Sequence, residues 1–168
     1  MSVTSVDRDD ENLTITLIAD FDARIDQVWE LWSDPRKLER WLGPPTHPAS
    51  VVKHDLIPAG EVRFSMTGPE GDASWGTWRV TAVDPPTSLE FTDAFAETDG
   101  TPIADMPVSK VTVHLTERGG GTRMEILAAF ESREDMEKWV GMCTVEGLQQ
   151  AVGHMEPLLG YGSSPRPR

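Results

Sequence analysis

The stretch VWELWSDPRKLERWLGP, residues 28–44, contains three of the six tryptophans of the chain. Its apolar residues continue a helical spacing that begins at Ile25, which predicts a short amphipathic helix. We expect this helix to use Asp26 as its N-cap and to end near Asp34. Pro35 suits the first turn of a second short helix, PRKLERWL, which the following Gly-Pro pair closes.

The tryptophans of this stretch are expected to be core wall rather than a recognition surface. Trp29 and Trp32 lie three residues apart on one helix face, a spacing typical of packing. Trp41 lies at the end of the second helix, so it is the one best placed at the rim of a pocket.

Composition limits the class of protein. A chain of 168 residues fits one globular domain, and its formal net charge of −13 disfavours nucleic acid and anionic membranes as partners. The single cysteine, Cys143, cannot form an internal disulfide, which favours a cytoplasmic location. We recognise no secretory signal at the polar N-terminus and no apolar run of the ~20 residues that a membrane helix needs.

Most of the remaining chain has the pattern of β-strands. Residues 1–12 are polar and are expected to form a flexible lead. Strands are predicted where apolar and polar residues alternate, with Gly119–Gly121 as a hairpin turn. The predicted strands cover residues 13–21, 50–57, 61–68, 74–84, 88–95, 109–117 and 122–130.

The last predicted element is a long helix from about Arg133 to about Leu159, with Ser132 as its cap. Its apolar positions fall on two faces rotated from one another, as crossing a twisted sheet would require. Residues 161–168 are expected to be a disordered tail because they are polar and rich in proline. The order of elements predicts an α+β domain: a curved antiparallel sheet of about six to seven strands wraps around this helix, and the two short helices follow the first strand.

Several stretches resemble a known family. They are VWELWSDPRKLERWLGP (28–44), HDLIPAGEVRFSMTGPEG (54–71), GTWRVTAVDPPTSLEFTDAF (76–95), VTVHLTERGGGTRME (111–125) and MCTVEGLQQAVGHMEPLL (142–159). In order and spacing they resemble the helix-grip, or START-like (SRPBCC), fold. More narrowly, they resemble the family named for the activator of heat-shock protein 90 ATPase homologue. The resemblance covers residues 13–160, which we therefore expect to form a single domain of bacterial type.

The resemblance implies a fold more than an activity. Relatives on this fold include lipid carriers, hormone receptors, polyketide cyclases and aromatase-like proteins, and the family shares no fixed catalytic set. Two positions depart from the family pattern: Leu148 stands where a tryptophan is common, and Leu42 follows Trp41 where two adjacent tryptophans are common. Both changes would reshape a cavity. We expect a chain of 168 residues to have no room for the second domain of the eukaryotic activators, so chaperone activation does not follow from the family name.

Eight residues are candidates for a ligand-binding cavity between the long helix and the sheet. They are apolar and are predicted to face inward, where they either fill the core or line a cavity of ~300–1,000 Å³. A curled sheet is too wide for one helix to fill, which favours the cavity. The candidates are Trp41, Phe64, Met66, Trp78, Phe91, Met124, Trp139 and Cys143.

We identify no catalytic residue, metal site or cofactor-binding motif. The four histidines do not have the spacing of metal ligands. Cys143 is expected to be buried among apolar residues, where a thiol is inert.

Three classes of function stay open. The leading hypothesis is non-catalytic binding or carriage of a small hydrophobic molecule, lipid-like or aromatic. The second is a chaperone cofactor that binds a partner of the heat-shock protein 90 type through an exposed patch. The third is an enzyme of the polyketide cyclase or aromatase type, which would need an acid or base inside the cavity. A homodimer also stays open, because nothing in the sequence decides the oligomeric state.

Overall fold

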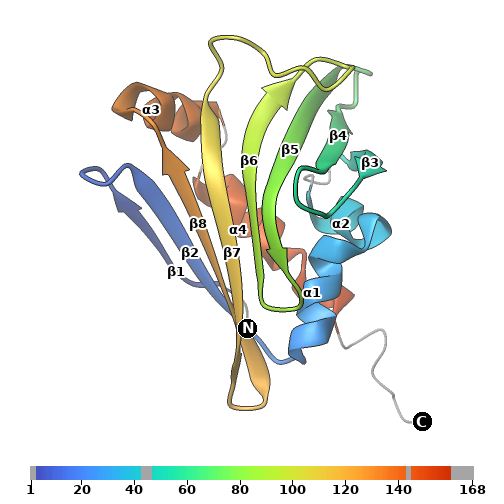
Figure 1. Ribbon diagram of the computed structural model, residues 1–168, viewed down its shortest axis with the longest axis vertical. Coiled ribbons are helices and arrows are strands. Elements are labelled where there is room, and N and C mark those ends of the chain that lie inside the picture. The colour runs from blue at the N-terminus through green and yellow to red at the C-terminus, as the bar shows by residue number, and fades with distance from the viewer. Residues whose placement is uncertain (1–2, 43–46, 143–144, 160–168) are drawn as a thin grey trace.

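One antiparallel sheet of eight strands forms the frame of the protein. The computed structural model describes residues 3–42, 47–142 and 145–159. The spatial order of the strands is β1-β2-β8-β7-β6-β5-β4-β3 (Figure 1). They are β1 (Val3–Asp9), β2 (Thr14–Phe21), β3 (Ala49–His54), β4 (Glu61–Thr67), β5 (Ala73–Asp84), β6 (Ser88–Ala96), β7 (Val108–Arg118) and β8 (Gly121–Phe130).

Four helices in the described part of the chain pack against different strands of this sheet. They are α1 (Ile25–Ser33), α2 (Pro35–Leu42), α3 (Arg133–Met142) and α4 (Val145–Gly153), followed by the 3-10 turn η1 (Glu156–Leu158). Helix α1 contacts β7 and β8, and α2 contacts β3 and also α1 and α4. In Figure 1, α4 crosses behind the strands and α3 lies at the end of β8. Among the described residues, no helix is long and apolar enough to cross a membrane.

Alternation along the strands explains which face the helices cover. In β2, every second residue from Ile15 to Phe21 is buried, and in β8 the same holds from Met124 to Phe130. Leu17 lies opposite Ile126 in the β2–β8 register, so the two buried rows share one face of the sheet. The prediction that Met124 faces inward is therefore confirmed.

The two helix starts differ in how well the sequence predicted their caps. The N-cap of α1 is Arg24 rather than the predicted Asp26, because the Gln27 side chain accepts the Arg24 backbone N–H at 3.1 Å in a capping box. Asp26 instead lies in the first turn, where its charge suits the helix dipole. The predicted cap of α3 is confirmed, because the Ser132 hydroxyl accepts the backbone N–H of Asp135 at 3.1 Å.

The sheet has eight strands instead of six to seven because the expected flexible lead contains a strand. Residues 3–9 form β1, with Val6 opposite Leu17 on β2. The polar sequence suits a sheet edge, and the Asp9 carboxylate accepts the backbone N–H groups of Glu11 and Asn12 in the following turn. The two short helices consequently follow the second strand rather than the first.

The predicted long C-terminal helix is not confirmed as one element. The structure describes α3 and α4 separately, with residues 143 and 144 outside the described residues. Helix α4 ends at Gly153, and Pro157 lies in the 3-10 turn η1, as its missing N–H favours. The predicted tail, residues 161–168, lies outside the described part of the chain.

A buried hydrogen bond joins β8 to the turn before α1. The Thr122 hydroxyl donates to the carbonyl of Ala23 at 2.8 Å, and Thr122 is 2% exposed. We expect Thr122→Val to lower the free energy of unfolding by about 1–3 kcal/mol, because the carbonyl loses this partner without a change in shape. Urea unfolding checks this value. The matched control is Thr116→Val on the exposed side of β7, which should stay within about 0.5 kcal/mol of the parent; equal losses in both variants would contradict the prediction.

Candidate functional site

An apolar cavity of about 220 Å³ lies between the sheet and the helices. Strands β4 to β8 and helices α1, α2 and α3 contribute its lining. The aromatic lining residues are Trp32, Trp41, Phe64, Trp75, Trp78, Phe91, Phe95 and Trp139. The cavity is smaller than the lower bound of ~300 Å³ expected from the sequence.

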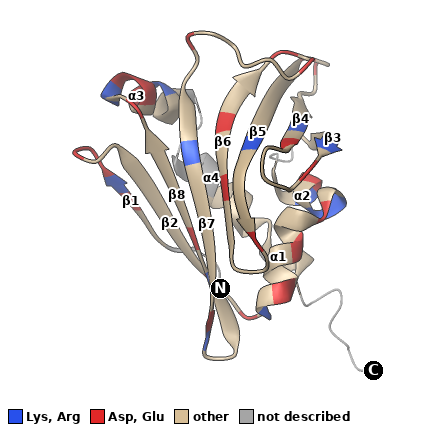
Figure 2. Ribbon diagram, viewed as in Figure 1, with Lys and Arg blue, Asp and Glu red and all other residues tan. Residues whose placement is uncertain are grey.

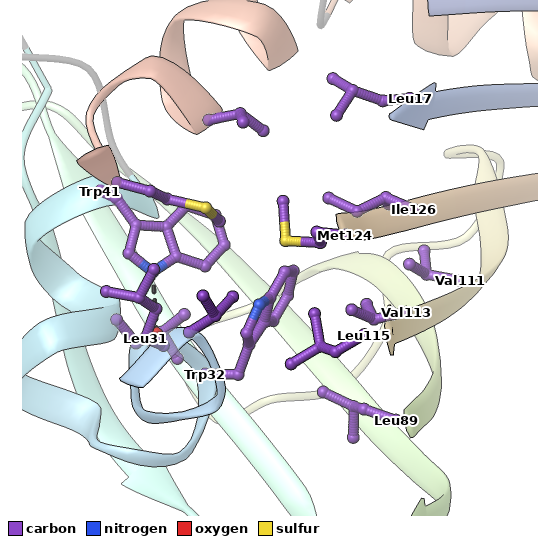
Figure 3. Close-up of a cluster of buried hydrophobic side chains, with 14 of the residues drawn as sticks. Leu17, Leu31, Trp32, Trp41, Leu89, Val111, Val113, Leu115, Met124 and Ile126 are labelled. Atoms are coloured by element: carbon purple, nitrogen blue, oxygen red, sulfur yellow. Dashed lines mark hydrogen bonds between the residues drawn. The ribbon is translucent and has the colours of Figure 1, made fainter. Parts of the chain in front are cut away.

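Six of the eight sequence-predicted site residues line this cavity: Trp41, Phe64, Met66, Trp78, Phe91 and Trp139. Met124 does not line it and is fully buried in the hydrophobic core beside it. Figure 3 shows Met124 in this core with Trp32 and Leu115. Cys143 lies outside the described residues. That the six lining residues bind a ligand stays a prediction.

One hydrogen bond between the two short helices fixes the position of Trp41. Trp41 donates its indole N–H to the carbonyl of Leu31 at 2.8 Å, drawn as a dashed line in Figure 3. This bond holds the end of α2 against α1 and turns the Trp41 ring toward the sheet. Trp29 is core, as predicted, whereas Trp32 both packs in the core and lines the cavity. The indole N–H of Trp32 has no hydrogen-bond partner among the described residues.

Aromatic side chains of the cavity wall contact one another. Trp78 stacks on Phe91 with ring centroids 4.2 Å apart, and Phe64 meets Trp78 edge-on at 5.8 Å. Trp32 packs edge-on against Trp41 at 4.8 Å. Gly76 lies opposite Phe64 on β5, and a Cβ at Gly76 would come within 2.5 Å of that ring. The glycine therefore lets the Phe64 ring lie directly over the strand.

One acidic side chain interrupts the apolar wall. Asp93 lines the cavity, on the same face of β6 as Leu89 and Phe91. In the sheet register it stands opposite Trp78 on β5 and Ser109 on β7. Sequence reasoning missed Asp93, although strict alternation from Leu89 and Phe91 would have placed it inward. Its position between Trp78 and Ser109 depends on pairing register, which the sequence did not supply.

Burial raises the pKa of the Asp93 carboxyl to about 7, and a hydrogen bond from the Trp78 side chain acts in the opposite direction. No ion pair to Asp93 occurs within the described ranges. The nearest basic residues on the neighbouring strands, Arg79 and Lys110, belong to the opposite face of the sheet, where Lys110 pairs with Glu90 at 3.4 Å. Asp93 is therefore a carboxyl group in an apolar site that exchanges its proton close to neutral pH.

The other perturbed carboxylates have an ordinary structural explanation. A guanidinium hydrogen bond lowers the pKa of Asp20, which meets Arg123 at 2.8 Å, and likewise that of Glu61 beside Arg63. Figure 2 shows acidic and basic residues interspersed along the strands and helices. Within the part of the chain that the structure describes, no group of three histidine, cysteine or acidic residues could hold a metal ion. Among the described residues, Asp93 alone combines a raised carboxyl pKa with a place in the cavity lining.

The architecture, an antiparallel sheet covered by helices with an apolar cavity between them, defines a protein of the helix-grip class. A family model described as "Activator of Hsp90 ATPase homolog 1-like protein" matches residues 22–160, and the chain belongs to that family. The family resemblance noted in the sequence is thereby confirmed. A comparison with curated proteins finds no significant match to the chain.

Solved structures share this fold over nearly the whole chain. The crystal structure of protein Ms6760 from Mycobacterium smegmatis is 42% identical, covering 95% of this chain and 98% of that one, with a TM-score of 0.87. The solution structure of a protein from Arthrobacter aurescens is 41% identical, covering 98% and 94%, with a TM-score of 0.89. A protein from Staphylococcus epidermidis is similar in fold alone, at 19% identity, 98% and 99% coverage and a TM-score of 0.82.

Asp93 makes the stability of the protein depend on pH. Its carboxyl pKa rises from 3.8 to about 7 on folding, so between these values the folded chain binds a proton that the unfolded chain has lost. Stability therefore falls as pH rises through this window. We expect Asp93→Asn to be about 2–4 kcal/mol more stable than the parent at pH 8, with the gain vanishing near pH 4.

Unfolding by urea at several pH values tests this dependence. Glu90→Gln is the matched control, because Glu90 lies on the opposite face of β6 and its pKa is lowered by a hydrogen bond from Thr81. This variant should show no gain at pH 8. A constant difference between Asp93→Asn and the parent from pH 4 to pH 8 would show that the Asp93 carboxyl is not perturbed.

Proposed function

We propose that the protein binds a small apolar molecule with one or two aromatic rings in the cavity beneath β4 to β8. The observation that carries this proposal is the aromatic lining around about 220 Å³ of space. A cavity of about 150 Å³ lined by apolar side chains accepts benzene, so this one has room for a substituted ring. A larger lipid-like ligand would have to extend beyond this volume.

The energetic cost of the cavity supports the same proposal. Apolar side chains that face unfilled space lose packing contacts on that side, which costs free energy. Larger side chains at the small lining positions Ala94 or Ala128 would remove much of that cost. A ligand that fills the space recovers contacts that the fold lacks, and the stacked walls are already in place to receive it.

Filling the cavity should abolish binding. Ala128 lines the cavity from β8, opposite Val111 in the register. We expect Ala128→Leu to weaken the binding of an aromatic probe such as indole at least tenfold, because the added carbons occupy the ligand space. Titration calorimetry measures the affinity, and circular dichroism checks that the variant folds.

The matched control is Ala129→Leu, one residue along β8. Ala129 belongs to the opposite face of the sheet, so this variant should bind like the parent. Equal binding by Ala128→Leu and the parent would place the ligand elsewhere. A parent protein that binds no small aromatic probe would overturn the proposed function itself.

Asp93 favours a second candidate function, an enzyme that moves a proton on a bound aromatic or ketone substrate. A general acid or base works best with a pKa near the working pH, and the Asp93 pKa of about 7 meets that condition inside an apolar site. The class of polyketide cyclase or aromatase requires such a group in the cavity. The comparisons leave this candidate open, because the solved structures under 25% identity support the fold alone.

Proton transfer can be tested without knowledge of the natural substrate. If Asp93 acts as a base, the parent should speed exchange of the α-protons of phenylacetone with D₂O, followed by NMR. Asp93→Asn should lose the acceleration at least a hundredfold, whereas Glu90→Gln should keep it. No acceleration by the parent at pH 7 to 8 would leave simple binding as the function of the cavity.

The chaperone-cofactor hypothesis receives no comparable support. A docking surface for a large partner would require a contiguous apolar patch of several hundred Å². Among the described residues, the exposed large hydrophobic side chains are Val52 and Ile57, near the edge strand β3. Two side chains do not make such a patch.

A further inference from the structure

We propose that the cavity selects a positively charged amine, whose ammonium group pairs with Asp93 while its apolar body fills the aromatic space. This inference rests on the proposed binding function and names the ligand class for the same site.

The first argument is the row of side chains across three strands. Trp78, Asp93 and Ser109 stand side by side on β5, β6 and β7, and all three line the cavity. The Trp78 side chain donates one hydrogen bond to the carboxylate, and a carboxylate has further lone pairs for other donors. The Ser109 hydroxyl makes no hydrogen bond to another described residue and can also accept one. An ammonium group carries three donors and suits these two acceptors.

The second argument is the missing counter-charge. Asp93 is the one titratable side chain among the described residues of the lining, which come from β4 to β8 and from α1, α2 and α3. The nearest cations along the register, Arg79 and Lys110, lie on the other face of the sheet. A carboxylate in an apolar site is costly unless a cation pairs with it. The described residues supply none, so a cationic ligand would complete the pair.

The third argument is the aromatic wall beside the acid. Trp75, Trp78 and Phe95 line the cavity from β6, which carries Asp93, and from its neighbour β5. A cation near the face of a tryptophan ring is attracted by the ring quadrupole, more strongly when both are desolvated. The net charge of −13 also raises the local concentration of cations at the protein surface. An anionic ligand, such as a fatty acid, would instead meet Asp93 as a like charge.

The pH dependence separates a cation from a neutral ligand. A cation binds the ionised carboxylate, and burial places the Asp93 pKa at about 7, so its affinity should fall nearly tenfold per pH unit below that value. A neutral alcohol can bind the protonated acid as well, and its affinity should not fall on acidification. No other titratable group of the described lining faces Asp93 to obscure this dependence.

Three probes of matched size test the proposal: phenethylamine, phenethyl alcohol and phenylacetate. Titration calorimetry at pH 8 should show the amine binding at least tenfold more tightly than the alcohol, with phenylacetate the weakest. In Asp93→Asn, amine affinity should drop at least tenfold and alcohol affinity should change less than threefold. Glu90→Gln, which removes a charge from the opposite face of the same strand, should keep the preference for the amine.

The outcomes distinguish the selection of amines from the binding function on which it rests. If the alcohol binds and Ala128→Leu blocks it, but the amine binds no more tightly, the selection of amines is overturned and cavity binding stands. The selection of amines is likewise overturned if Asp93→Asn keeps the preference for the amine. If none of the three probes binds the parent, both proposals fail.

Discussion

The hydrogen bond from the Trp41 indole to the carbonyl of Leu31 is the contact on which the arrangement of the two short helices over the sheet depends. It holds α2 against α1, and α2 in turn contacts β3 and α4. Because Trp41 is fixed in this way, Trp32 can pack edge-on against it and reach the Trp78 and Phe91 rings on the sheet. The large aromatic side chains of the short helices thus reach across to the rings on the sheet. The cavity is the space that remains under this aromatic bridge.

The presence of the Asp93 carboxyl group in an apolar cavity calls for a physical explanation. The wall around Asp93 is largely apolar, and the nearest cations on the neighbouring strands, Arg79 and Lys110, lie on the other face of the sheet. The protein keeps a carboxyl group where an apolar residue of similar size would cost nothing in desolvation. Elsewhere in the described chain, carboxylates with shifted pKa values have hydrogen-bonding partners on the outer surface that favour their charged form. The contrast supports the proposed role of Asp93 in recognition or proton transfer rather than in holding the fold.

The fold was largely predictable, because alternation marks the strands and helical spacing marks α1 and α2. The strands from β2 to β8 lie within a few residues of their predicted bounds. The prediction failed at β1, whose polar sequence suits an open sheet edge as well as it suits a flexible segment. It also failed at Asp93, since apolar residues were taken as the only inward ones. Met124 was predicted on the correct face of β8, but it does not line the cavity. Alternation predicts which face of the sheet a residue lies on. Whether that residue reaches the cavity also depends on strand register and on where the helices lie.

The strand order has a consequence for how the chain assembles. The last strand, β8, lies between β2 and β7, so Leu17 finds its partner Ile126 only after more than a hundred residues have followed it. Until then, the buried face of the β1–β2 hairpin has neither a sheet neighbour on its inner edge nor a helix to cover it. Contacts between such distant segments slow folding, and the meander from β3 to β7 can form first from local pairings. During synthesis, the β1–β2 hairpin can therefore pair with the β3–β7 meander only after β8 has been made. The turn that leads into β8 contains Gly119 and Gly120, both with positive φ.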